Sequence, residues 1–188
     1  MHRISANRAG VVPMQMPAST VRPLEVALFD SEERLVTLDV DWNRLASGSG
    51  SCMSITWEWL HTWWSVYGRE RCELRVVTVR RDGVLIGALP LVCYVERMGM
   101  RRARVLRFLG TGEPEADEVV SEYIDMLAVP GCDAVVAAAI SEYLVEHRHA
   151  WDVLVLKDLL ADARVLQTLA PLLAARGCEI RRERAGAR

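Results

Sequence analysis

The sequence predicts an α/β (α+β) fold in which a mixed sheet carries helices on both faces. Side chains alternate in character on either side of Asp82-Gly83, which is the pattern of an antiparallel hairpin. Apolar residues recur at helical spacing before and after that hairpin. The chain has 188 residues, 51% of them hydrophobic and 26% charged, so it is long and apolar enough to bury one core.

The first predicted elements are a strand and two helices. The strand covers residues 24–29, and Asp30 and Ser31 are residue types that cap helices, so we expect a first helix to about Leu45. After a Ser-Gly loop over 47–51, Thr56 is placed to cap a second helix, and Gly68 is placed to end it.

The middle of the chain predicts antiparallel strands. Residues 73–80 alternate cleanly, Asp82-Gly83 makes a two-residue turn, and residues 84–95 return. Pro90 cannot donate a backbone hydrogen bond, so we expect an edge or a bulge at that position. A further strand is predicted over 104–109.

The remaining chain predicts strands alternating with helices. Asp133 is expected to cap a helix that runs to about His147, and Gly177 to end the last helix. The predicted segments are strand 123–129, helix 133–147, strand 151–156, helix 162–176 and strand 178–182. The complete order is β-α-α-β-β-β-β-α-β-α-β, within a lobe at 24–183 that follows a disordered lead-in at 1–23 and precedes a short tail at 184–188.

Composition excludes several classes of function. A formal net charge of −2 gives no basic footprint for nucleic acid. No apolar run reaches the roughly 18 residues of a membrane-spanning helix. The five cysteines form no CxxC pair and no secretory signal precedes them, so we expect reduced thiols, a cytoplasmic protein and no metal site.

Four tracts carry a resemblance to a known family. They are Thr56-Trp-Glu-Trp-Leu-His-Thr-Trp-Trp64, the hairpin end Gly87-Ala-Leu-Pro-Leu91, Arg107-Phe-Leu-Gly-Thr-Gly-Glu113 and Ser121-Glu-Tyr-Ile-Asp125. With the element order above, they resemble the N-terminal half of the CelD-like acetyltransferases. That family consists of bacterial proteins of the GNAT type, related to the FemAB enzymes and associated with cellulose and other polysaccharide production.

The resemblance implies a two-lobed protein whose acyl-CoA site lies mainly in a second GNAT-like lobe. We therefore expect acetyl-CoA for the full-length family but no binding by this chain alone, which would then be an inactive N-terminal lobe, either truncated or naturally single. GNAT enzymes hold the coenzyme A pyrophosphate on backbone N–H groups at a helix N-terminus. The equivalent turn here, Val129 to Asp133, carries Pro130 and an acid, so no cofactor-binding residue is assigned.

The acidic segment supplies the candidate catalytic and acceptor-binding residues. Glu113, Glu122, Tyr123 and Asp125 flank a Gly-Thr-Gly turn within the family-like tracts, and they could provide acid–base groups or contacts to a small-molecule or saccharide acceptor. Glu115, Asp117 and Glu118 are better interpreted as a solvated acidic loop.

The tryptophan helix has two aromatic sides. Trp57, Leu60, Trp64 and Tyr67 form one side, and Trp59 and Trp63 form another. Core packing plus a domain contact is favoured over a carbohydrate platform made by Trp59 and Trp63. The alternative function is a non-catalytic protein-interaction module that uses this helix, and an exposed apolar patch would favour self-association.

Overall fold

The computed structural model describes residues 23–49, 52–114, 116, 119 and 121–183 and shows a mixed α/β fold. Its strands form two four-stranded sheets, in the orders β1-β3-β4-β7 and β2-β5-β6-β8. The strands are β1 Leu24–Phe29, β2 Glu73–Leu74, β3 Val76–Arg81, β4 Val84–Leu89, β5 Leu91–Met98, β6 Arg101–Phe108, β7 Leu127–Ala128 and β8 Val153–Leu154. The helices are α1 Glu32–Leu35, α2 Asp39–Gly48, α3 Trp57–Trp63, α4 Asp133–Glu146 and α5 Ala170–Ala175.

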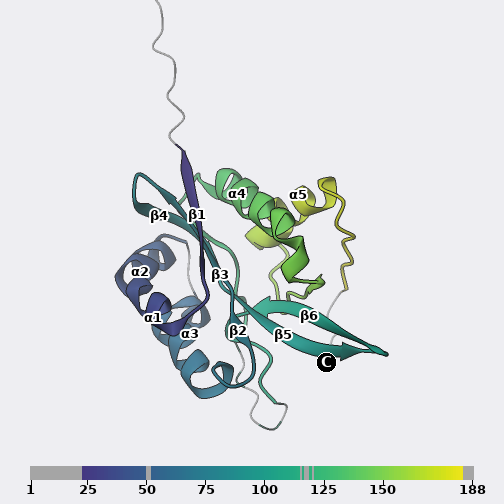
Figure 1. Ribbon diagram of the computed structural model, residues 1–188. Coiled ribbons are helices and arrows are strands. Elements are labelled where there is room, and N and C mark those ends of the chain that lie inside the picture. The colour runs from purple at the N-terminus through teal and green to yellow at the C-terminus, as the bar shows by residue number, and fades with distance from the viewer. Residues whose placement is uncertain (1–22, 50–51, 115, 117–118, 120, 184–188) are drawn as a thin grey trace, which may run out of the picture.

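Helices cover both faces of the first sheet, as predicted. The group α1–α3 lies on one side of β1, β3 and β4, and α4 with α5 lies on the other (Figure 1). Between β3 and β4 the chain reverses through Asp82 and Gly83, whose φ angles of 52° and 75° have the sign that a type I′ turn requires. The predicted hairpin is therefore confirmed at its turn.

The two sheets share two long strands that are each interrupted once. Residues 73–81 break at Arg75, and residues 84–98 break at Pro90. Pro90 is not at an edge, because Leu109 lies on one side of it and donates its N–H to the Pro90 carbonyl oxygen at 3.0 Å. The missing N–H of proline therefore ends one ladder and lets the strand enter the second sheet, which corrects the expectation of an edge or a bulge.

Strands β6 and β7 pair with the same side of the interrupted strand over 84–98, and a long connection, which we call the excursion, separates them in the sequence. Strand β6 pairs with β5 up to Phe108, and β7 then pairs with β4 from Leu127. The predicted strand over 123–129 is reduced to Leu127–Ala128, and Tyr123 at its predicted start has a φ of 61°, outside the extended region of strands. The excursion over 109–126 holds most of the predicted site residues.

The helical segments follow their predicted caps in part. The Ser31 and Thr56 side chains accept the N–H groups of Arg34 and Trp59, as expected of N-caps. Asp133 is the first residue of α4, and the N-cap is Cys132, whose side chain makes no capping hydrogen bond. The first predicted helix is interrupted by a single turn over Val36–Leu38, and α3 continues as a π turn to Gly68.

The end of the described chain departs from prediction. Strand 151–156 shortens to β8, and the last helix begins near Arg164 with a π turn over Val165–Leu169 before α5. Gly177 has a φ of 88°, the left-handed conformation expected after a helix. No strand forms over 178–183 in the described part, so the predicted final strand is wrong. The lead-in before residue 23, the tail after 183 and the predicted loop residues Glu115, Asp117 and Glu118 lie outside the described residues.

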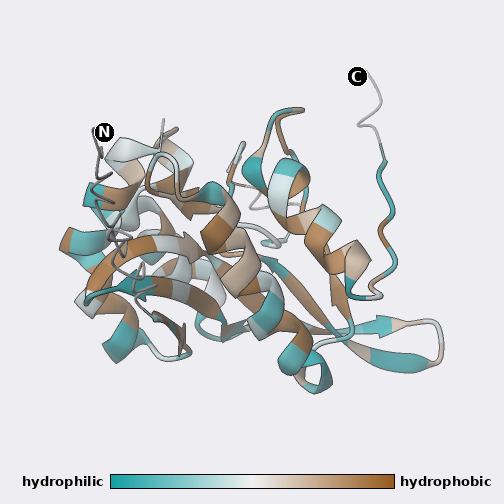
Figure 2. Ribbon diagram, turned by 90° about the horizontal axis from the view of Figure 1, so that it is seen from above, coloured by the Kyte–Doolittle hydropathy of each residue, from teal (hydrophilic) through white to brown (hydrophobic). Residues whose placement is uncertain are grey.

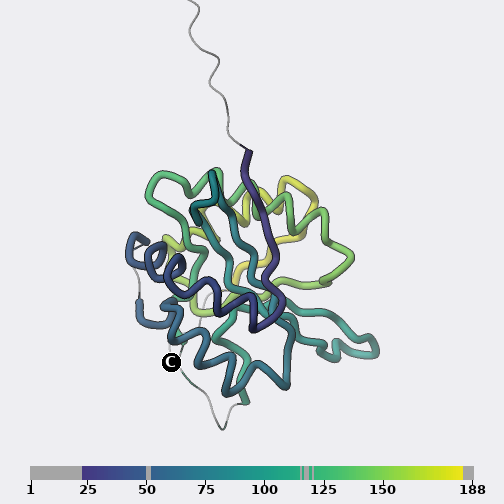
Figure 3. Tube along the Cα trace, turned by 60° about the vertical axis from the view of Figure 1, so that its left-hand side comes forward, coloured from purple at the N-terminus to yellow at the C-terminus, as the bar shows by residue number. Residues whose placement is uncertain are grey.

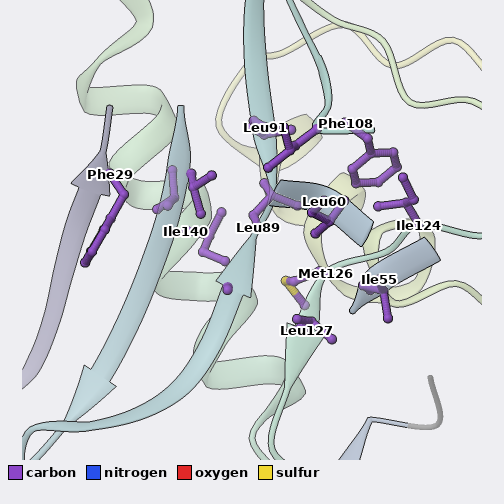
Figure 4. Packing of buried hydrophobic residues seen from close by; sticks show 14 of the residues in the cluster. Phe29, Ile55, Leu60, Leu89, Leu91, Phe108, Ile124, Met126, Leu127 and Ile140 are labelled. Carbon is purple, nitrogen blue, oxygen red and sulfur yellow. The ribbon is translucent and has the colours of Figure 1, made fainter. Parts of the chain in front are cut away.

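One apolar core joins the two layers of helices to both sheets. Figure 4 shows its centre, where Leu60 of α3, Leu89 and Leu91 on either side of Pro90, and Met126 lie near one another. Val136 of α4 packs directly over Gly87 of β4, because a Cβ built on Gly87 would overlap both methyl groups of that valine. Trp42, Leu38 and Ile140 are fully buried in the same cluster.

Candidate functional site

A surface pocket of about 460 Å³ opens beside the end of the excursion. Three parts of the chain that are far apart in the sequence form it: Ser49, Cys52 and Ile55 after α2, residues 123–127, and residues 160–164. Its volume falls in the range of small-molecule sites, roughly 300–1,000 Å³. The structure thus brings the predicted residues Tyr123 and Asp125 to one pocket, together with Arg164 and Cys52, which the sequence did not single out.

Asp125 anchors the wall of the pocket. Its carboxylate oxygens accept the N–H groups of Arg164 at 2.6 Å and Val165 at 3.0 Å, and also that of Met126 at 2.7 Å. Burial raises the pKa of Asp125, while those N–H donors act against the increase. Asp125 therefore holds the start of the last helical segment, a structural task that the strand-like pattern around it did not indicate.

The pocket residue Tyr123 and its hydrogen-bond partner Asp158 both have the left-handed backbone conformation, which residues other than glycine rarely adopt. Tyr123 and Asp158 have φ angles of 61° and 53°, and the Tyr123 N–H donates to the Asp158 carbonyl oxygen at 3.2 Å. Such left-handed residues cluster at binding sites, where surrounding structure holds them in place. Tyr123 is 45% exposed.

Arg164 connects the pocket to the beginning of α4. Its Nε donates to Asp133 Oδ1 at 2.7 Å, and its terminal nitrogen donates to the Ser49 carbonyl oxygen at 3.1 Å. Sequence reasoning missed Arg164 because it lies at the start of an apolar helical run, and the spacing of that run gives no sign of its distant partners.

The N-terminus of α4 does not fit the pyrophosphate of acyl-CoA. The Asp133 carboxylate occupies the first helical position, where it would repel a phosphate, and Pro130 lacks an N–H. The Cys132 N–H is already bonded to the Val129 carbonyl oxygen at 2.8 Å. The nearby cation, Arg164, is paired with Asp133. This turn therefore provides no cofactor cradle.

Glu113 and the tryptophans form a second cluster along the same excursion. The Trp63 Nε1–H donates to Glu113 Oε2 at 3.0 Å, and the Trp59 Nε1–H donates to Ser121 Oγ at 2.9 Å. The other Glu113 oxygen accepts the Val119 N–H. Trp63 is 3% exposed, so its ring offers no open face to a sugar in this chain, whereas Trp59 is half-buried.

Glu122 lies apart from these groups. Its side chain is exposed, and only its carbonyl oxygen has a partner in the site, the Cys52 Sγ at 3.4 Å. Within the described part of the chain, no group of three or more His, Cys, Asp or Glu residues could hold a metal ion. No helix among the described residues is long and apolar enough to span a membrane.

Comparison with known proteins finds similarity only among solved structures. No protein-family model matches the chain, and no curated protein matches it. A ribosomal-protein-alanine N-acetyltransferase from Brucella melitensis biovar Abortus 2308 is similar over 88% of this chain and 98% of its own, with 12% identity and a TM-score of 0.48. An integron cassette protein from the mobile metagenome of V. cholerae covers 88% of this chain and 91% of its own, with 10% identity and a TM-score of 0.44. Similarity at this level concerns the course of the backbone alone.

Proposed function

We propose that the chain is the N-terminal lobe of a GNAT-type acyl-CoA-dependent N-acyltransferase, linked to cellulose or other polysaccharide production and inactive alone. In this proposal the lobe contributes acceptor contacts, and a second GNAT-like lobe binds acetyl-CoA. The four sequence tracts and the element order support the family. The observation that carries this division between the lobes is Asp133 at the first position of α4, where its carboxylate would oppose a pyrophosphate and already engages Arg164.

The pocket suits a small acceptor that carries hydroxyl or amino groups. Its polar groups are the Tyr123 phenol, the Asp162 carboxylate and the rim of the Asp125–Arg164 network, and apolar walls come from Ile55 and Leu160. A few polar groups on an apolar lining orient a ligand by hydrogen bonds while burial supplies affinity. The chemistry of this lobe would be to hold and orient the acceptor.

Burial weakens the alternative of a protein-interaction module. Trp63 and Trp64 are 3% and 6% exposed, so the α3 tryptophans belong largely to the core. Because these tryptophans are buried and cannot contact a partner protein, the acceptor-binding lobe is the better supported proposal.

Two titrations of the purified chain test the proposal. Calorimetry with acetyl-CoA should give no binding heat, because the first turn of α4 repels phosphate; micromolar binding would show that the chain holds its own donor. Glucosamine, which carries both an amine and hydroxyls, should shift the amide NMR signals of 121–127 and 160–164. Tyr123→Phe should weaken that response, and Tyr143→Phe, on α4 outside the pocket, should not. Shifts confined to other regions would contradict an acceptor site here.

A further inference from the structure

The hairpin of β5 and β6 extends well beyond the body of the molecule. We call its outer part, residues 94–104, the arm. Figures 1 and 3 show it projecting from the rest of the chain, and Figure 2 shows it mainly in hydrophilic colours, in contrast with the brown strands of the body. Only the inner part of this hairpin pairs with β2 and β8, at residues 92–93 and 105–106. Among the described strands, none other therefore lies beside the arm.

The arm exposes large apolar side chains, two of them at its tip. Met100 is 97% exposed, Met98 54% and Val95 61%. The two methionines flank Gly99, whose φ of 63° has the sign required at the first position of a type II′ hairpin turn. The arm does not need these apolar groups for its own core, since all three are exposed to solvent, Met98 and Met100 at the tip and Val95 nearer the base.

The arm is strongly basic within an acidic chain. Between residues 94 and 104 the sequence has four arginines and one glutamate, whereas the whole chain has a net charge of −2. Arg104 is paired with Asp152, and Glu96 is paired with Arg107 at the base of the arm. Arg97, Arg101 and Arg102 form no ion pair with any of the described residues. Within the described part of the chain, three arginines near the apolar tip therefore have no acidic partner.

We propose that the arm docks on an anionic lipid surface. Methionine side chains at the tip would enter the interface, and the arginines behind them would meet the phosphate and carboxylate groups of the headgroups. The charge distribution favours this orientation, because the remainder of the chain is acidic and would be repelled. A second copy is a poorer occupant, since two arms would repel each other. Nucleic acid would leave the methionines in water, and the arm has no exposed aromatic ring to stack on bases.

Vesicle sedimentation with the intact chain tests this proposal. Binding is expected to vesicles that contain phosphatidylserine and not to pure phosphatidylcholine, and it should weaken as salt is raised. Arg101→Gln with Arg102→Gln should lower the affinity by roughly 25-fold, since each arginine near an anionic surface contributes about a factor of five. Met98→Ser with Met100→Ser should lower the affinity while leaving its salt dependence unchanged.

A matched pair of substitutions provides the control. Met53→Ser with Arg148→Gln removes one exposed methionine and one exposed arginine from the body of the molecule, and it should leave vesicle binding unchanged. Melting curves should be the same for all variants, because the substituted side chains are exposed. Absence of binding to anionic vesicles, or equal loss in the control, would overturn the proposal. The proposal would also be overturned if the arm variants lost binding to duplex DNA or to an acidic protein but still bound anionic vesicles.

Discussion

Gly87 shows how one missing side chain sets the distance between a strand and a helix. A Cβ at this position would overlap both methyl groups of Val136, so β4 and α4 can approach only because glycine stands there. We expect Gly87→Ala to lower the free energy of unfolding by about 1–3 kcal/mol in urea denaturation. Gly48→Ala is the control, because its nearest neighbour would be Pro130 Cδ at 3.8 Å. Equal effects of the two substitutions would contradict this role.

The buried thiol of Cys72 makes the free energy of unfolding depend on pH. Burial raises its pKa to about 11 from the model-compound value of 9.0. The unfolded chain loses this proton first, so the contribution is complete below pH 9 and is lost as pH rises towards 11. Under reducing conditions, the urea midpoint should therefore fall across this interval.

Replacement of the thiol isolates its part in that fall. Burial raises the pKa of Tyr94 as well, so some decrease should remain in Cys72→Ala, with a smaller slope against pH. An unchanged slope in Cys72→Ala would show that the thiol is not responsible.

At the scale of elements, Asp125 fixes where the last helical segment begins. Asp125→Asn replaces one acceptor oxygen by an NH₂ group that would face the N–H of Arg164 or Val165. We expect a loss of about 1–3 kcal/mol in the free energy of unfolding, with faster hydrogen exchange at both amides. Asp162→Asn, also in the pocket but exposed, should change neither quantity. Intact amide protection in Asp125→Asn would refute the capping role.

Some element boundaries followed from local chemistry and others did not. The first strand, the Asp82-Gly83 turn and the caps at Ser31 and Thr56 depend on neighbouring residues, and all four agree with prediction. The strand expected over 123–129 does not begin at Tyr123, which is left-handed and donates its N–H to Asp158, 35 positions away along the chain. Local pattern contains no information about such a partner.

At the scale of the whole molecule, two interrupted strands connect the two sheets, because each contributes a strand to both of them. The breaks at Arg75 and Pro90 face each other, since the Arg75 N–H donates to the Leu91 carbonyl oxygen at 2.9 Å. Beyond the breaks the second sheet turns away, which leaves its distal hairpin as the basic arm. The excursion that returns to the first sheet closes the pocket against residues 160–164. Arm and pocket thus both derive from the same split.

The candidate site divides in the same way between what was predictable and what was not. The sequence indicated Tyr123 and Asp125 because they lie in an acidic, family-like tract, and the structure places both in the pocket. It did not indicate Arg164 or Cys52, because their positions depend on contacts over 39 and 70 residues. Glu122 and Trp63 were also predicted from family-like tracts, yet Glu122 is exposed and Trp63 is buried.

The sequence by itself determined the class of fold, the order of its elements as far as the last helix, and the hairpin turn, since periodicity, caps and left-handed turn residues act over a few positions. Only the tertiary structure decided that Pro90 divides one sheet into two, that Asp133 pairs with Arg164, and that the basic stretch after Tyr94 becomes a free arm. Those outcomes depend on pairing between distant segments. Such pairing is selected by the burial of the whole core, which no short window of sequence contains.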